Sequence, residues 1–263
     1  RGSRSNAHRK TRSCVLRSWP MPGSIIAFSS SLHDSPASLQ TRCRSNGQNL
    51  RSCRVRFWDE GCAAPAVTGY KANIKLKPGA QVPFRQPYHL SKFDQTRLSY
   101  LYEEAVAEGK VEEFALGENP PAICTPVFIV DKKGSVIGRR VGDFTLFNKV
   151  TEDYYYPAPE ADQILMRACG QQFHTTMDCV WGFSQLDVDE ETSAILSTIT
   201  LFGVYKTKKL PEGVKQGPSL FQHFQATALG HEVKDDGHPL CDIFVDDTHV
   251  GDETKEKHFK SLE

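Results

Sequence analysis

Hydrophobic and polar positions divide the chain into a first part without periodicity and a second part with it. Residues 1–65 show neither the two-residue alternation of a strand nor the 3.6-residue recurrence of a helix. They are rich in Ser, Arg, Asn, Gly and Pro, so we interpret them as a disordered arm or linker. Periodic segments follow one another from about Tyr70, which predicts a folded domain over 66–263.

The clearest amphipathic helix is predicted directly after Ser91. Ser91 is suited to cap the helix N-terminus, with Asp94 three residues later, and Gly109 is suited to end it. Apolar side chains recur between them at helical spacing: Phe93, Leu98, Leu101, Tyr102, Ala105 and Val106.

The rest of the pattern mixes short strands with short helices. Strands are predicted over 72–76, 126–130, 136–141, 173–178, 184–188, 198–202, 204–210, 240–245 and 248–250. Helices are predicted over 161–168, from Pro218 to Gly230, and over 254–262. Because strands and helices do not alternate regularly, the pattern favours an α+β fold over a doubly wound sheet.

Charge is distributed unevenly along the 263 residues. The chain has 32 Lys and Arg against 32 Asp and Glu. Residues 1–56 hold eleven of the basic side chains and one acidic one, Asp34, which gives 11 − 1 = +10 there and 21 − 31 = −10 in the remainder. Since clustered Arg neutralises phosphates without needing a fold, the arm is alternatively a nucleic-acid-binding tail.

Several classes of protein are excluded by the composition. No run of about 18 apolar residues exists, so we expect no membrane span. The eight Cys form no CxxC pair and are too sparse for a disulfide scaffold, so we expect reduced thiols in an intracellular protein. The first residue is Arg1, which indicates a processed product or a piece of a longer reading frame.

Carboxylates follow two of the predicted strands. Asp246 and Asp247 come directly after the apolar run 243–245, and Asp178 ends the strand 173–178. Carboxylates at the end of a buried strand need a partner or a cation, and Mg²⁺ prefers oxygen ligands. If the two strands are neighbours, the three carboxylates could hold two metal ions for phosphoryl transfer. The alternative for each is a solvated turn or a cap.

Two further segments could contact a phosphorylated ligand. Lys132 and Lys133 lie in a predicted hairpin turn, and Arg139 and Arg140 lie on its return strand, where a basic hairpin could close over a triphosphate. The loop 210–217 carries two glycines before the helix at Pro218, which would allow close approach of a ligand. An exposed turn and an ordinary connector are the alternatives.

Taken in order, these segments resemble the fingers and palm of a reverse transcriptase, closest to those of gypsy-type LTR retrotransposons. The resemblance covers residues 71–263. It rests on 74–80, Arg85-Gln86-Pro87-Tyr88, 125–135, 143–150, 156–159, Met177-Asp178-Cys179 with Gly182-Phe183, 210–222, and Phe244-Val245-Asp246-Asp247.

The resemblance implies a right-hand polymerase fold, with an antiparallel palm sheet backed by helices and with fingers inserted before it. Asp178 and Asp246 would hold two Mg²⁺ ions (Mn²⁺ is an alternative), assisted by the Cys179 carbonyl and supported by Asp247. Nucleotide contacts would come from five residues: Lys132, Lys133, Arg139, Phe183 and Gly213. Phe183 would lie under the sugar and favour deoxynucleotides over ribonucleotides.

Some positions depart from the family pattern. Glu212 stands where Phe or Gln is usual, and it would be unfavourable beside a triphosphate unless Lys208, Lys209 or Lys215 offsets it. Thr145 stands where an Arg is usual. In two other places the pattern changes: Gly138-Arg139-Arg140 shifts an aromatic–Arg motif, and Asp242 interrupts an apolar strand.

The resemblance implies an RNA-directed DNA polymerase fragment of a retroelement polyprotein. Its partners would be an RNA or DNA template with its primer and deoxynucleoside triphosphates, in a cytoplasmic particle or the nucleus, with no membrane. Because the chain ends soon after the Asp-Asp pair, we expect the thumb, RNase H and integrase to be absent from it. The alternatives are a catalytically inert nucleic-acid-binding remnant and, less well matched, a metal-dependent nuclease or phosphatase.

Overall fold

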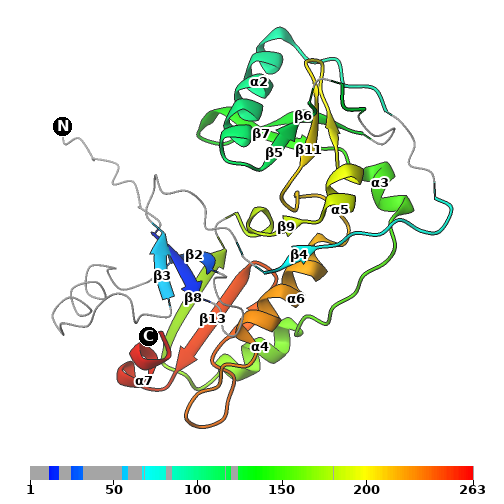
Figure 1. Cartoon of the computed structure of the whole chain (residues 1–263). Coiled ribbons are helices and arrows are strands. Elements are labelled where there is room, and N and C mark those ends of the chain that lie inside the picture. Colours follow the sequence, from blue (N-terminus) through cyan, green and yellow to red (C-terminus); the bar gives the residue numbers. More distant parts are fainter. Residues whose placement is uncertain are drawn as a thin grey trace, which may run out of the picture. The chain divides into compact units, whose positions relative to one another are not determined.

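The computed structural model describes three short strand segments near the N-terminus and most of the chain after residue 67. The described residues are 12–17, 25–31, 55–58, 67, 69–80, 85–115, 117–119, 124–179 and 181–262. They belong to two compact units, which we call unit 1 (1–65, 159–180 and 226–263) and unit 2 (66–158 and 181–225). Helices and three separate sheets are mixed in Figure 1, which confirms the expected α+β class.

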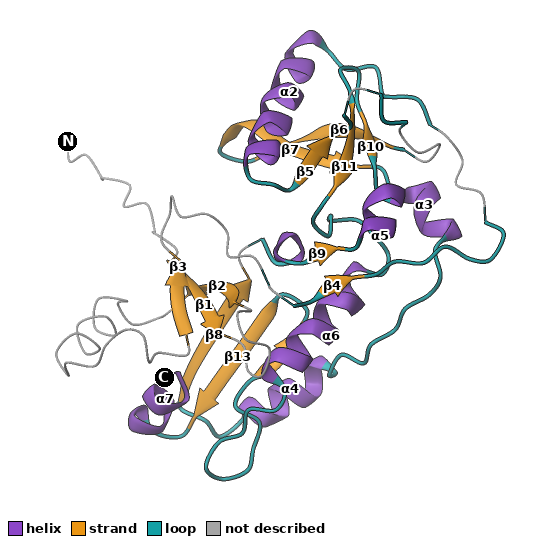
Figure 2. Ribbon diagram, viewed as in Figure 1, coloured by secondary structure: helices purple, strands orange, loops and turns teal. Residues whose placement is uncertain are grey.

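Unit 2 contains a five-stranded sheet in the order β5-β11-β10-β6-β7. Its strands are β5 (Val111–Glu113), β11 (Val204–Thr207), β10 (Thr198–Ile199), β6 (Thr125–Lys132) and β7 (Ser135–Gly142). The helix α2 (Lys92–Ala107) packs against β5, β6 and β7, as Figure 2 shows. The main cluster of buried residues lies between them: Leu98, Tyr102, Ala105, Val111, Val127 and Tyr205.

Both ends of α2 follow the sequence signals. The side chain of Ser91 accepts a hydrogen bond from the backbone N–H of Asp94, which satisfies one of the free donors of the first turn. Gly109 has a φ of 68°, a left-handed conformation that glycine adopts without strain and that ends the helix. The predicted cap residues are therefore confirmed.

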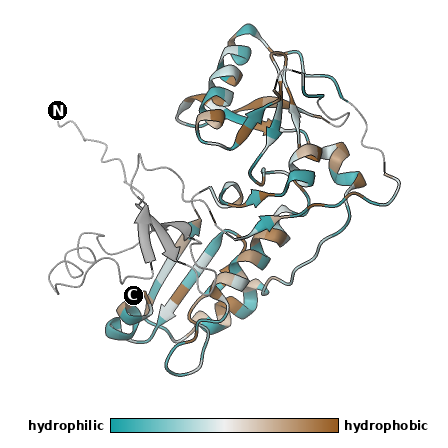
Figure 3. Ribbon diagram, in the orientation of Figure 1, coloured by the Kyte–Doolittle hydropathy of each residue, from teal (hydrophilic) through white to brown (hydrophobic). Residues whose placement is uncertain are grey.

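Shorter elements complete unit 2. They are β4 (Lys71–Ala72), which pairs with β9 (Asp187–Val188), and the helices α3 (Thr145–Val150), α5 (Glu190–Ile195) and η1 (Phe183–Gln185). The helix α6 (Gly217–Leu229) begins in unit 2 and continues into unit 1. Figure 3 shows hydrophobic and hydrophilic stretches mixed along α6. Its buried hydrophobic residues include Leu220, Phe221 and Phe224.

Unit 1 contains a six-stranded sheet in the order β12-β13-β8-β2-β1-β3. The strands are β12 (Asp242–Phe244), β13 (Asp247–Asp252), β8 (Phe173–Cys179), β2 (Ile25–Ser31), β1 (Arg12–Arg17) and β3 (Val55–Trp58). Its strands pair in antiparallel fashion. The last three strands lie in the segment for which the sequence gives no period, and the rest of residues 1–65 falls outside the described part.

Two helices accompany this sheet, α4 (Ala161–Ala168) and α7 (Lys255–Leu262). The helix α7 packs on β8 and β13 through a buried polar chain. His258 Nδ1 lies 2.9 Å from Asp252 Oδ2, and its Nε2 lies 2.8 Å from Thr175 Oγ1. Lys234 Nζ lies 2.9 Å from the same carboxylate, so the buried charge of Asp252 has an opposite partner.

Four sequence predictions of strands need correction. The predicted strand 184–188 begins instead as the 3₁₀ helix η1, and only 187–188 is extended. The predicted strand 72–76 is reduced to Lys71–Ala72 and an isolated bridge at Leu76, and the hairpin 198–210 pairs only over β10 and β11. The strand 240–245 is likewise reduced to Asp242–Phe244.

Two further predictions concern the membrane and the cysteines. Within the described residues, no helix is both long and apolar enough to cross a bilayer. Among the cysteines with described side chains, Cys169 and Cys241 are free thiols.

Candidate active site

The carboxylates selected from the sequence gather at one end of the unit 1 sheet. In the register of β13 with β8, Asp247 lies directly opposite Asp178, and Figure 1 shows the two strands side by side. Residues facing one another in such a pair project to the same side of the sheet, and both Asp side chains are exposed. Their neighbours Met177 and Thr248 point to the buried side.

A tight turn brings the third carboxylate to the same end. Val245 and Asp246 form the turn between β12 and β13, and the backbone N–H of Cys179 donates to the carbonyl of Asp246 over 3.0 Å. The sequence assigned both aspartates to the turn, whereas Asp247 already begins β13. Val245 has a φ of 51°, which is strained for a β-branched residue, and strain of this kind concentrates at functional sites.

The two facing carboxylates carry like charges. Like charges directly opposite on a sheet are destabilising, and facing Cβ atoms in such pairs are about 4.5–5.5 Å apart. Within the described part of the chain, no three His, Cys, Asp or Glu side chains are grouped so as to hold a metal ion. The carboxylate oxygens still fit Mg²⁺, since this ion usually takes one or two protein carboxylates and completes its shell with water and substrate phosphates.

A histidine pair lies on the same exposed face of the sheet. His174 Nδ1 and His249 Nε2 are 3.0 Å apart, and the rings stack with their centroids separated by 5.3 Å. Asp242 of β12 lies opposite His249 in the register and is bound by Arg167 of α4, whose Nε donates over 2.7 Å. Burial and the neighbouring His174 lower the pKa of His249.

In unit 2 the basic hairpin forms as expected. The turn at Lys133 and Gly134 joins β6 to β7, and Lys132 and Lys133 are exposed at its tip. Arg139 is also exposed, opposite Val130. Arg140 lies with its guanidinium 5.1 Å from the ring centre of Tyr102, so of the two arginines Arg139 is the one that faces solvent.

The glycine loop is fastened to α3 by one asparagine. Asn148 Nδ2 donates to the carbonyl of Gly213 over 2.8 Å, and its Oδ1 accepts from the backbone N–H of Lys215 over 2.8 Å. Between these two bonds the backbone turns at Gly213, with a φ of 90° that an L side chain rarely adopts. The loop therefore has a fixed conformation, and Gly213 is exposed in it.

Phe183 lies against the start of α6. Its ring packs edge-on against Phe221 with a centroid separation of 5.4 Å, and a Cβ atom placed on Gly217 would lie 3.9 Å from it. The ring is half-buried and is held between the turn at Gly182 and this helix. The residues selected from the sequence thus fall into two groups: Asp178, Cys179, Asp246 and Asp247 belong to unit 1, whereas Lys132, Lys133, Arg139, Phe183 and Gly213 belong to unit 2.

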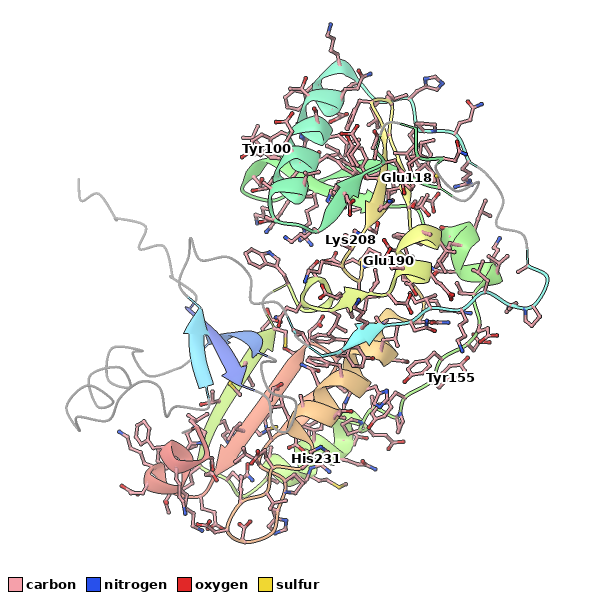
Figure 4. All side chains as sticks on the ribbon, in the orientation of Figure 1. Tyr100, Glu118, Tyr155, Glu190, Lys208 and His231 are labelled. Atoms are coloured by element: carbon pink, nitrogen blue, oxygen red, sulfur yellow. The ribbon has the colours of Figure 1, made fainter. Side chains whose placement is uncertain are left out.

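The three lysines expected to offset Glu212 form ion pairs with other carboxylates. Lys208 lies 2.8 Å from Glu112, Lys209 lies 2.5 Å from Asp187, and Lys215 lies 2.7 Å from Asp153. Figure 4 labels Lys208 among the strand and helix residues of this unit. The sequence-based compensation of Glu212 is therefore not found in these pairs.

A second acidic residue is integrated into a network near the same loop. Asp143 accepts hydrogen bonds from the backbone N–H of Thr145 over 3.1 Å and from the hydroxyl of Tyr88 over 2.6 Å, and it also pairs with Arg85. The bonds from Thr145 and Tyr88 lower the pKa of Asp143, and the bond to Asp143 raises the pKa of Tyr88. Asp143 thus ties the segment around residue 85 to the start of α3.

Sequence reasoning missed Asn148, the strained Val245 and the pair His174–His249. An asparagine inside a short helix gives no local signal of a bond to a loop 65 residues away. Backbone strain cannot be inferred from a valine. For the histidines a weak signal existed, because His249 is the central residue of the predicted return strand 248–250.

Comparison with known proteins gives distant similarity to polyproteins of retroelements and plant pararetroviruses. The chain is 27% identical over 195 residues to the putative enzymatic polyprotein of Cassava vein mosaic virus, which covers 71% of the chain and 28% of that protein. It is 31% identical over 142 residues to the retrovirus-related Pol polyprotein from transposon opus of Drosophila melanogaster, covering 52% of the chain and 14% of the relative.

A third relative is similar over a comparable stretch. The Pol polyprotein from transposon 297 of Drosophila melanogaster is 26% identical over 188 residues, or 68% of the chain and 16% of the relative. The matched segment thus spans between 14% and 28% of the length of these three relatives. No family model matches the chain.

Proposed function

We propose that residues 66–263 are the fingers and palm of an RNA-directed DNA polymerase from a retroelement polyprotein. The observation that carries the proposal is the cross-strand pair Asp178–Asp247 beside the strained turn at Val245–Asp246. The similarity to Pol and enzymatic polyproteins supports it, since these relatives are named as retrovirus-related or enzymatic.

In this proposal one group of residues would hold the metal and another would hold the nucleotide. Asp178 and Asp246, with the Cys179 carbonyl, would hold two Mg²⁺ ions, and Asp247 would support them. Such ions would supply Lewis-acid activation of the primer 3′-hydroxyl and charge stabilisation for the pyrophosphate. Lys132, Lys133 and Arg139 neutralise the triphosphate, and catalysis consists of positioning and charge stabilisation.

Primer extension on an RNA template tests the proposal. We expect Mg²⁺-dependent incorporation of deoxynucleotides by the full chain, and a loss of at least about 100-fold in Asp178→Asn and Asp246→Asn, since metal ions contribute several kcal/mol to such reactions. Asp162→Asn serves as the matched control, because Asp162 is exposed in the first turn of α4 in the same unit.

The outcomes separate the candidate functions. Equal incorporation by the wild type and both variants would reject the proposed site. Template cleavage without incorporation would favour a metal-dependent nuclease. Circular dichroism of each variant checks that the loss does not arise from unfolding.

The second candidate function is a catalytically inert remnant that binds nucleic acid. The observation that favours it is the net charge of +10 in residues 1–56, where eleven basic side chains stand against the single acidic residue Asp34. Clustered basic side chains neutralise phosphates. In that case the chain binds RNA or DNA in a salt-sensitive way and incorporates no nucleotide.

A further inference from the structure

Arg97 of α2 bridges the two strands of the basic hairpin. Its Nη2 donates to Asp131 Oδ1 of β6 over 2.7 Å, and its Nε donates to the Ile137 carbonyl of β7 over 2.8 Å. These strands lead directly into the tip that carries Lys132 and Lys133. Because a guanidinium presents its donors in a rigid fork, one side chain fixes both strands beside the tip.

The hairpin has a bulge at this point. Between the facing pairs Val130–Arg139 and Lys132–Ser135, β6 has one residue and β7 has three, 136–138. A bulge bends its strand and re-aims the side chains that follow it. The direction of the basic tip therefore depends on how the bulge is held.

Gly138 leaves room for the guanidinium in this bulge. Its φ is 77°, a left-handed conformation that glycine adopts without strain. A Cβ atom added there would collide with Arg97 Nη2 and would lie 2.7 Å from the Val130 carbonyl oxygen. The bulge thus accepts the arginine only because residue 138 has no side chain.

The helix α2 holds Arg97 in the orientation that this bridge requires. Arg97 Nη1 donates to Asp94 Oδ1 over 3.0 Å, and the guanidinium carbon lies 5.1 Å from the centre of the Phe93 ring. All three side-chain nitrogens of Arg97 therefore have a partner, and its side chain is only 11% exposed. The arginine is fixed on the helix and connects it to both strands of the hairpin.

We propose that Arg97 is a positioning residue, which holds the bulge so that Lys132, Lys133 and Arg139 keep the orientation in which they bind the triphosphate. This inference rests on the proposed function of the hairpin. Arg97 contacts neither the nucleotide nor a reacting atom in this scheme. Its loss should therefore weaken nucleotide binding and leave the chemical step unchanged, which raises KM but not kcat.

Steady-state primer extension by the full chain, with dTTP as the varied nucleotide, tests this role. We expect Arg97→Gln to raise the KM for dTTP by about three- to ten-fold, the effect of one or two lost hydrogen bonds, with kcat unchanged. Gly138→Ala keeps the arginine but fills its place, and should raise KM in the same way. Lys92→Gln is the control, because it removes an exposed positive charge from the same end of α2.

Hydrogen exchange without nucleotide or template tests the bridge by itself. Amides of residues 131–139 should exchange at least about five-fold faster in Arg97→Gln than in the wild type, because the hydrogen bond to β7 and the ion pair to β6 are both lost. The control Lys92→Gln should exchange like the wild type. Unchanged exchange in Arg97→Gln would overturn the bridge.

The kinetic outcomes separate this proposal from the proposed function. A lower kcat with unchanged KM in Arg97→Gln would overturn the positioning role, since that result indicates loss of folded enzyme. Arg97→Lys keeps the charge without the fork, so a wild-type KM there would overturn the bridge in favour of charge alone. If the wild type incorporates no dTTP, the proposed function fails, and the nucleotide role of Arg97 fails with it. If the wild type is active and KM is unchanged in Arg97→Gln, only the positioning role fails.

Discussion

At the scale of single residues, alternation along β8 separates a buried side from a functional side. Thr175, Met177 and Cys179 are buried, and Asp178 between them is exposed. One residue of register shift would bury the carboxylate and expose the apolar set, so the pairing with β13 fixes where Asp178 points. The period-two pattern made this strand predictable, whereas the partner strand required the fold.

The ion pairs of the lysines near Glu212 could not be predicted from the sequence. Lys208 and Lys209 were equally suited to Glu212 by their spacing, yet each pairs with a carboxylate far away in the chain. Such pairs arise from strand neighbours: Lys208 directly follows β11 and pairs with Glu112 of the neighbouring strand β5. Spacing alone contains no information on which acidic residue will be the neighbour.

Removing the charge of Glu212 should improve nucleotide binding. Glu212 is exposed next to Gly213, where the proposed function brings a triphosphate, and like charges in water repel weakly. We expect the Kd of Mg²⁺–dTTP to fall by about two- to five-fold in Glu212→Gln, a small effect because the site is solvated. Calorimetric titration with primer–template present measures it.

The control for this prediction removes the same charge elsewhere in unit 2. Glu104→Gln is suitable, since Glu104 is exposed on α2. A fall in Kd of equal size in both variants would mean that the effect comes from the net charge of the protein and not from the position of Glu212. An unchanged Kd in Glu212→Gln would contradict a triphosphate beside this loop.

At the scale of elements, the sequence predicted those helix ends and turns that depend only on residues nearby in the chain. Ser91 and Gly109 specify the two ends of α2, and the turn at 133–134 specifies the hairpin of β6 and β7. The strand predicted at 184–188 failed because its alternating apolar residues also suit a 3₁₀ turn. There Gln185 N–H donates to the Gly182 carbonyl and Leu186 N–H to the Phe183 carbonyl.

The asparagine link between α3 and the glycine loop leads to a prediction at this scale. In Asn148→Ala both hydrogen bonds to the segment 213–215 are lost. We expect faster hydrogen exchange of the Lys215 amide, by about 10-fold or more, because a typical hydrogen bond contributes about 1 kcal/mol. Mass spectrometry of peptides covering the loop measures the exchange.

A conservative variant separates the two bonds. Asn148→Asp keeps the oxygen that accepts from Lys215 N–H but removes the donor to the Gly213 carbonyl, so protection of the Lys215 amide should largely return. If Asn148→Ala leaves this amide as protected as in the wild type, the loop is not held by Asn148.

At the scale of the whole molecule, the charge asymmetry concerns a segment that also contributes to the fold. Residues 1–56 carry the net charge of +10, and the same segment supplies β1 and β2, of which β2 pairs with β8. Deleting the segment would therefore remove charge and a strand partner of β8 together. A test of nucleic-acid binding has to change the charge and keep the strands.

Four arginines outside the described strands meet this requirement: Arg42, Arg44, Arg51 and Arg54. If they neutralise phosphates, their replacement by Gln should make the binding constant less sensitive to salt. For a single-stranded RNA the negative slope of log K against log salt should become shallower by about 3, since each phosphate contact contributes roughly 0.7. Fluorescence anisotropy with a labelled oligonucleotide at several salt concentrations gives the slope directly.

The control variant changes the same number of charges in the described part of the chain. Lys71, Lys255, Lys257 and Lys260 are exposed and can be replaced by Gln together. Because salt dependence counts the phosphates that are neutralised, a general effect of net charge would lower the slope equally in both variants. A change confined to the arginine variant assigns RNA binding to residues 42–54, whereas an unchanged slope there contradicts a nucleic-acid-binding arm.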